Sequence, residues 1–120
     1  MATPNIVNVA TLQGACIAGA VTTSRVAVVD VTDDYTFKIN TVIIANIDGV
    51  NSADITIEVS VDNGTTYFAL AKTVPVPADS SISVLDTPLY LDETDHLAVT
   101  ASDNSDLTYV ISYEMIRDTP

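Results

Sequence analysis

The sequence predicts an all-β protein: a single antiparallel β-sandwich, of the jelly-roll or immunoglobulin-like kind, with an N-terminal arm. Val, Ile and Thr occupy 43 of the 120 positions, and β-branched side chains suit pleated strands better than helices. Turn-forming Asp and Asn residues recur at short intervals, and strand-length runs without helical periodicity lie between them. The length fits one domain, and a hydrophobic content of 48% is enough for a core.

The clearest element is a hairpin over residues 54–72. Apolar and polar residues alternate from Ile55 to Val61, so one face of this strand is apolar. Asn63-Gly64 then supplies the two positive-φ positions of a type I′ turn. Counting outward from the turn places Val59 opposite Phe68 and Ile57 opposite Leu70. We therefore expect these four side chains in the core.

Further strands are predicted by shorter apolar runs. They cover residues 36–47, 81–85, 88–91, 96–101 and 107–116. In the last of these, Val110 and Ile116 lie on the face opposite the main apolar series, which predicts that this second face is partly covered too. Val74–Pro77 contains two prolines, each without an amide donor, and is predicted to be an extended connection between sheets.

The first 24 residues differ from the rest, because all twenty charged side chains lie in residues 25–120. We divide the chain into an N-terminal arm or extra strand, residues 1–24, and a β-sandwich domain, residues 25–120. An uncharged apolar segment avoids the cost of burying charge at a contact. The residues predicted for contacts with a neighbouring molecule are Ile6, Val7, Val9, Leu12 and, from the outward face of the hairpin, Tyr67.

Charge excludes several partners. Four Lys and Arg residues stand against sixteen Asp and Glu, giving a net charge of −12. This balance excludes binding to a nucleic-acid backbone or an anionic membrane surface. No apolar run reaches the roughly 18 residues of a spanning helix. The first basic residue is Arg25, so the positive start of a secretory signal is missing.

No catalytic motif is visible. The single His, His96, is not linked by any motif to Cys16 or Ser102, whereas nucleophilic catalysis needs a base held beside its nucleophile. We predict a non-enzymatic protein without a cofactor. Asp92, Glu93 and Asp95 form the densest acidic cluster and are weak candidates for calcium. The alternative is a solvated set of turn-forming residues, because no EF-hand pattern is present.

Several stretches resemble small virion structural proteins of tailed bacteriophages, especially those of marine cyanobacterial phages. These stretches are Met1–Val9, Ile44–Val59, Val74–Asp86, Leu89–Asp95 and Tyr113–Ile116. The motifs consist of turns and strand ends, so the resemblance implies a scaffold and a setting, with no catalytic residues to transfer. It implies a β-sandwich present in many copies per particle.

The resemblance implies a capsid decoration, or cement, protein on the exterior of the virion, made in the host cytoplasm. Its partners would be the major capsid protein and itself, as a homotrimer. Two alternatives remain open: a tail, neck or baseplate component, and a receptor- or carbohydrate-binding module at a fibre. Sandwich folds host all three functions.

Overall fold

The chain folds into two antiparallel β-sheets packed face to face, which confirms the predicted all-β sandwich. The computed structural model describes residues 9–32 and 34–118. Nine strands lie in these residues: β1 (Val9–Ala20), β2 (Val26–Asp30), β3 (Tyr35–Asn46), β4 (Ala53–Ser60), β5 (Phe68–Val76), β6 (Ser81–Ser83), β7 (Leu89–Leu91), β8 (His96–Ala101) and β9 (Leu107–Asp118). No helix in the described ranges is long and apolar enough to cross a membrane.

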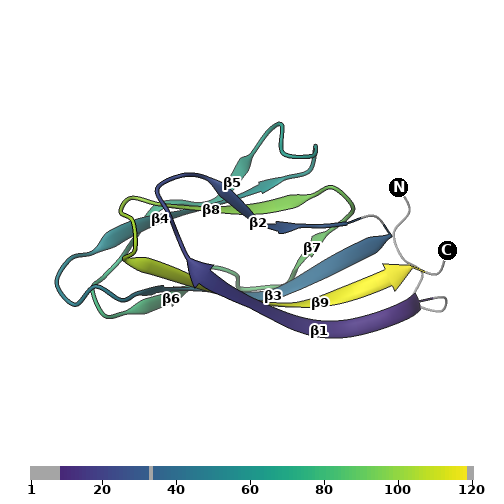
Figure 1. The fold of residues 1–120 in the computed structure, drawn as a ribbon, viewed down its shortest axis with the longest axis horizontal. Helices are drawn as coiled ribbons and strands as arrows, with labels where there is room; N and C mark the ends of the chain where they lie inside the picture. Colours follow the sequence, from purple (N-terminus) through teal and green to yellow (C-terminus); the bar gives the residue numbers. More distant parts are fainter. Residues whose placement is uncertain (1–8, 33, 119–120) are drawn as a thin grey trace.

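One sheet has five strands and the other has four. The five-stranded sheet runs β1-β9-β3-β6, with β7 also paired to β3. The four-stranded sheet runs β2-β8-β4-β5. In Figure 1 the five-stranded sheet forms the lower layer, and β1 sweeps along its border. The predicted strands at 36–47, 81–85, 88–91, 96–101 and 107–116 are confirmed to within a few residues, whereas β2 was not predicted.

The core lies between the two sheets. From the five-stranded sheet, Ile39, Val42 and Ile44 of β3 are fully buried, together with Ile111 of β9. The other sheet contributes five large apolar side chains with 1% exposure or less, namely Ile55, Ile57, Val76, Leu97 and Val99. Because successive side chains of a strand point to opposite faces, this core fixes which residues of each strand face outward.

The predicted hairpin is correct at its turn and for Ile57 and Val59, which lie in or against the core, and wrong for Phe68 and Leu70. Asn63 and Gly64 have φ values of 62° and 81°, and Val59 pairs with Phe68. Ile57, however, pairs with Ala71 instead of Leu70. Phe68 and Leu70 are 62% and 40% exposed, so neither belongs to the core.

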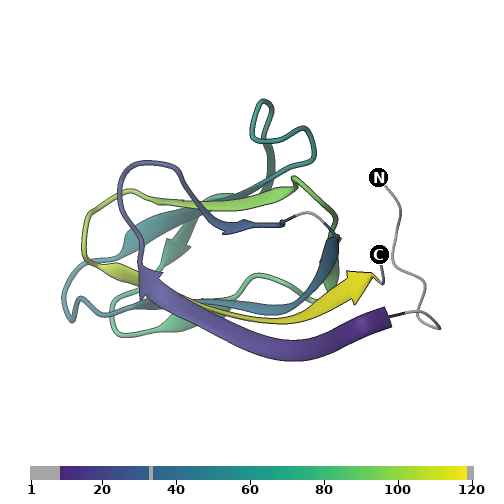
Figure 2. The ribbon, with the colours of Figure 1, turned by 45° about the vertical axis from the view of Figure 1, so that its right-hand side comes forward.

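One extra residue in β5 changes the partner of Ile57 from Leu70 to Ala71, and a second extra residue follows before Val74. The register of β5 against β4 shifts on either side of Ile57, and Thr73 has a positive φ of 46°. Such bulges displace the alternation of one strand relative to its partner. The loop between β4 and β5 rises on the outer side of the four-stranded sheet (Figure 2), where Gly64 and Tyr67 lie against His96. Phe68 begins β5 directly after this loop.

The prediction for Val74–Pro77 is wrong in part. Val74, Pro75 and Val76 continue β5, opposite Ile55, Asp54 and Ala53. A proline is tolerated there because β5 is an edge strand, whose outer side needs no donor. The chain crosses to the other sheet only after Val76, on the way to β6.

Candidate interaction surface

The calcium candidates hold a turn together. The hydroxyl of Thr36 donates to Asp92 Oδ1 at 2.7 Å, and the amide of Asp92 donates to Asp95 Oδ2 at 2.9 Å. Burial raises the pKa of Asp95 above its ordinary value. Glu93 lies beside them, half-buried. Among the described residues, no group of three or more His, Cys, Asp or Glu is placed to hold a metal ion.

His96 lies on the four-stranded sheet, away from both candidate nucleophiles. Its Nδ1 is 3.4 Å from the Tyr67 hydroxyl. Its Nε2 lies 3.1 Å from Asp30 Oδ1, yet the pair is not aligned for a hydrogen bond, and Nε2 has no such partner in the described chain. Cys16 is on β1 in the other sheet, and the hydroxyl of Ser102 accepts the amide of Asp54 at 2.8 Å. This arrangement does not build a nucleophile and base.

Tyr67 makes contacts within the chain. The guanidinium of Arg25 lies 4.2 Å above the centre of its ring. Arg25 also donates from Nε and Nη2 to the two carboxylate oxygens of Glu58, at 2.9 and 3.1 Å, and this bond raises the pKa of Arg25. Ala98 lies opposite Glu58 and points to the outer face, because Leu97 and Val99 on either side of it fill the core. It is nevertheless fully buried. The chain therefore covers this part of the outer face of the four-stranded sheet with its own side chains.

The outer face of the five-stranded sheet is different. Lys38 and Glu114 lie opposite each other on β3 and β9. The three cross-strand rows beyond this pair carry no charged side chain. They are Cys16–Ser112–Thr41, Ala18–Val110–Ile43–Ser83 and Ala20–Thr108–Ala45–Ser81. We call the residues of these three rows the uncharged face.

The uncharged face is accessible in the described chain. Val110 and Ile43 are each 38% exposed at its centre. Cys16, Ala18 and Ala20 are also exposed. The face combines six apolar or small side chains with five Ser and Thr side chains, and it lacks the charged residues that occupy much of the rest of a water-facing surface. A face without charge avoids the desolvation of ions on contact, so it is the candidate contact surface. The outward Val110 and Ile116 were the sequence signal for this face, but no described residue supplies the predicted cover for Val110.

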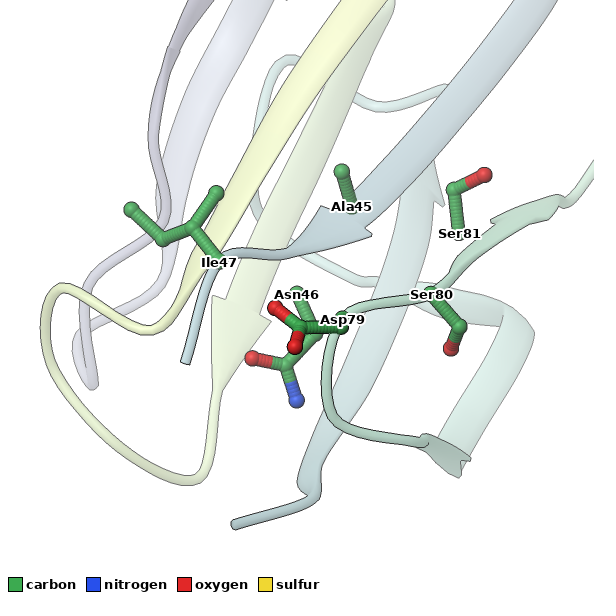
Figure 3. Close-up of a pocket in the computed structure, with 6 residues that line it drawn as sticks. All are labelled: Ala45, Asn46, Ile47, Asp79, Ser80 and Ser81. Atoms are coloured by element: carbon green, nitrogen blue, oxygen red, sulfur yellow. The ribbon is translucent and has the colours of Figure 1, made fainter. Parts of the chain in front are cut away.

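An open depression of about 490 Å³ lies at one end of this face. Figure 3 shows the side chains of Ala45 and Asn46 extending in opposite directions from the end of β3. The Asn46 amide donates to Val76 O and Asn51 O at 2.9 and 3.0 Å, so its donors are already used. The remaining lining residues are Ile47, Asp79, Ser80 and Ser81. This lining contains no pair of a nucleophile and a base, and it joins the uncharged face at Ala45 and Ser81.

The residues predicted for intermolecular contact fall in different places. Leu12 is 61% exposed on β1, in line with Cys16 and Ala18 along the same side of the strand. Tyr67 is half-buried under Arg25 in the other sheet. Val9 begins β1, but its side chain, like all of Ile6 and Val7, lies outside the described part of the chain. The structure therefore does not bring Leu12 and Tyr67 together.

Comparisons with known proteins concern the fold. No protein-family model and no curated protein match the sequence. A protein of the Bacillus endospore appendages, described as disulfide-linked pili, aligns with a TM-score of 0.53 at 14% identity, over 92% of this chain and 88% of that chain. A pentameric capsid protein from metagenomic phage sequences aligns with a TM-score of 0.39 at 16% identity, over 97% of this chain and 64% of that chain. The first likeness shows a shared sandwich fold.

Proposed function

We propose that this chain is a non-enzymatic structural protein of a bacteriophage virion. In this proposal it is a capsid decoration protein that binds the outside of the shell at contacts between major capsid subunits. The resemblance of its sequence to small virion proteins provides the setting. The observation that carries an adhesive function is the uncharged face, because it is an accessible surface free of charge on a chain with a net charge of −12.

The distribution of charge favours adhesion to another protein through the uncharged face and disfavours adhesion to DNA. Burying Val110, Ile43 and the small side chains around them would contribute about 25 cal/mol for each Å² of apolar area. No ion has to be desolvated in these rows, whereas the acidic surface elsewhere keeps the protein soluble and repels DNA. A contact of this kind depends little on ion pairs and tolerates salt.

Decoration acts by mass action. A protein that binds only the assembled shell stabilises it by RT ln(1 + [L]/Kd) per site, and many equivalent sites multiply this effect. The protein would associate with itself as well as with the major capsid protein. The homotrimer implied by the resemblance remains an expectation.

The test compares Val110→Glu with Val50→Glu on shells that lack the protein. Val110 lies on the uncharged face, and Val50 lies outside it and is 84% exposed. Both variants carry the same added charge. Co-sedimentation should show binding by Val110→Glu weakened at least tenfold and binding by Val50→Glu near that of the wild type. Equal binding by both variants would contradict attachment through this face.

The number of copies of this protein per virion tests whether it belongs to the capsid or to the tail. Densitometry of purified virions against the major capsid band should give hundreds of copies per particle for a decoration protein. A few to a few dozen copies would instead place the chain in the tail, neck, baseplate or fibre, and a protein absent from virions would overturn the proposal.

A further inference from the structure

The two sheets expose strand edges that differ in their protection against pairing with other molecules. Short strands, bulges, prolines and lysines are the devices that protect an edge. The strands that pair with the outer side of β3 are β6 and β7, and each of them is only three residues long. β2 has five residues and a register shift. β5 contains Pro75, Lys72 and two register shifts.

β1 has none of these protections along most of its length. It is twelve residues long and contains neither proline nor a charged residue. It pairs with β9 without interruption from Thr11 to Ala20. No strand of the described chain pairs with its other side, and β1 runs along the border of the sheet in Figures 1 and 2. The amide and carbonyl groups that point outward from alternate residues are therefore available to an added strand.

We propose that a second copy of this chain occupies the edge, with the two β1 strands antiparallel across a twofold axis. From Thr11 to Ala20, β1 is the one described edge without a protective device, so a partner copy pairs best through the same part of its own β1, and a twofold contact closes both edges. Two chains with a net charge of −12 repel each other, and β1 brings no charge to the contact. Gly14, Cys16, Ala18 and Ala20 are small and leave room for close approach.

This pairing joins the two five-stranded sheets into one. It places the uncharged faces of two copies next to each other on the same side, where two weak attachments would act together. The self-pairing does not depend on the proposed attachment to a capsid shell. It links copies in pairs, so the mass of the assembly distinguishes it from the trimer that the resemblance implies.

The experiment measures the mass of the full chain by sedimentation equilibrium over a range of concentrations. The test variant is Cys16→Lys with Ala18→Lys, which puts two exposed positive charges on β1. The control is Ser112→Lys with Val110→Lys, because these residues lie opposite the same two positions on β9. Both variants change the net charge equally on the same face of the sheet. Like charges on adjacent strands destabilise their pairing, and Lys protects an edge.

The wild type and the β9 control should sediment as dimers, and the β1 variant should dissociate at least tenfold more readily. A wild-type monomer or trimer would overturn the proposal. Equal dissociation of both variants would also overturn it, because that result indicates stacking of sheet faces. Circular dichroism checks that both variants fold.

Hydrogen exchange in the wild type provides the second measurement. Alternate β1 amides should exchange several-fold more slowly at high protein concentration than at low. Protection that does not change with concentration would mean that residues of the same chain cover the edge, and would overturn the pairing.

Discussion

Gly64 lies directly against the imidazole of His96, and a Cβ atom at position 64 would come within 2.9 Å of both Cε1 and Nδ1 of that ring. The amide of Gly64 also donates to the Ser60 hydroxyl at 2.8 Å, and its φ is 81°. Two requirements therefore coincide at this residue: a left-handed backbone, which favours glycine, and close approach to a side chain. Together they hold the β4–β5 loop against the four-stranded sheet.

Gly64→Ala should destabilise the fold by about 1–3 kcal/mol, the range for a strained backbone position. Chemical denaturation followed by circular dichroism measures this change. Gly14→Ala is the matched control, because a Cβ at Gly14 meets no atom within 4 Å. Alanine there should be neutral or stabilising by up to about 1 kcal/mol, since glycine weakens a strand. Equal stability of the two variants would contradict the close packing at Gly64.

Phe68→Ala and Phe37→Ala compare the same substitution at two levels of burial. Phe37 is 8% exposed, and its ring stacks on Tyr113 with centroids 5.0 Å apart. Its removal should cost about 3–5 kcal/mol. Phe68 is 62% exposed, and surface substitutions of this kind change stability by only about 0.5 kcal/mol. Urea unfolding midpoints check the difference, and a large loss for Phe68→Ala would place that ring in a buried contact.

The sequence predicted the strands well because alternation is a local signal. The Asn63-Gly64 turn was also predictable from the local sequence, because both residues tolerate positive φ. The wrong placement of Leu70 came from counting outward from the turn without a bulge. A bulge depends on how β5 fits against β4 in the folded sheet, and that fit is not visible in the pattern of one strand.

The uncharged face was only partly predictable. Val110 and Ile116 showed that one strand has apolar residues on both faces, but not which strands lie beside it. The placement of β9 between β1 and β3 brings Ala18, Val110 and Ile43 into one row, and that order is a property of the topology. Tyr67 was predicted to face outward, and the contact with Arg25 comes from a residue 42 positions away in sequence, beyond the reach of a local pattern.

Asp62 should keep its charge to unusually low pH. Its carboxylate accepts bonds from the Thr66 amide and the Ser60 hydroxyl, both at 2.8 Å, and these bonds lower its pKa from 3.8 to about 2. Because the folded pKa lies below the unfolded one, the stabilisation is complete above pH 3.8 and is lost as pH falls toward 2.

Carboxyl NMR titration of Asp62 should give a midpoint near pH 2. The Thr66 amide should become less protected from hydrogen exchange over the same range, after correction for the pH dependence of intrinsic exchange. Asp62→Ala should remove this pH-dependent protection. A midpoint near 3.8 would show that the loop bonds are not maintained in solution.

Calcium should not stabilise the β7–β8 turn. Asp92 Oδ1 already accepts the Thr36 hydroxyl, and Asp95 Oδ2 already accepts the Asp92 amide, so a cation would compete with both bonds. Thermal unfolding should give the same Tm with millimolar CaCl₂ and with a chelator at matched ionic strength. Asp95→Asn should be neutral or slightly stabilising at pH 7, because burial disfavours the charged carboxylate and the amide oxygen can still accept the Asp92 amide. A Tm that rises with Ca²⁺ in the wild type and not in Asp95→Asn would instead assign a calcium site to this turn.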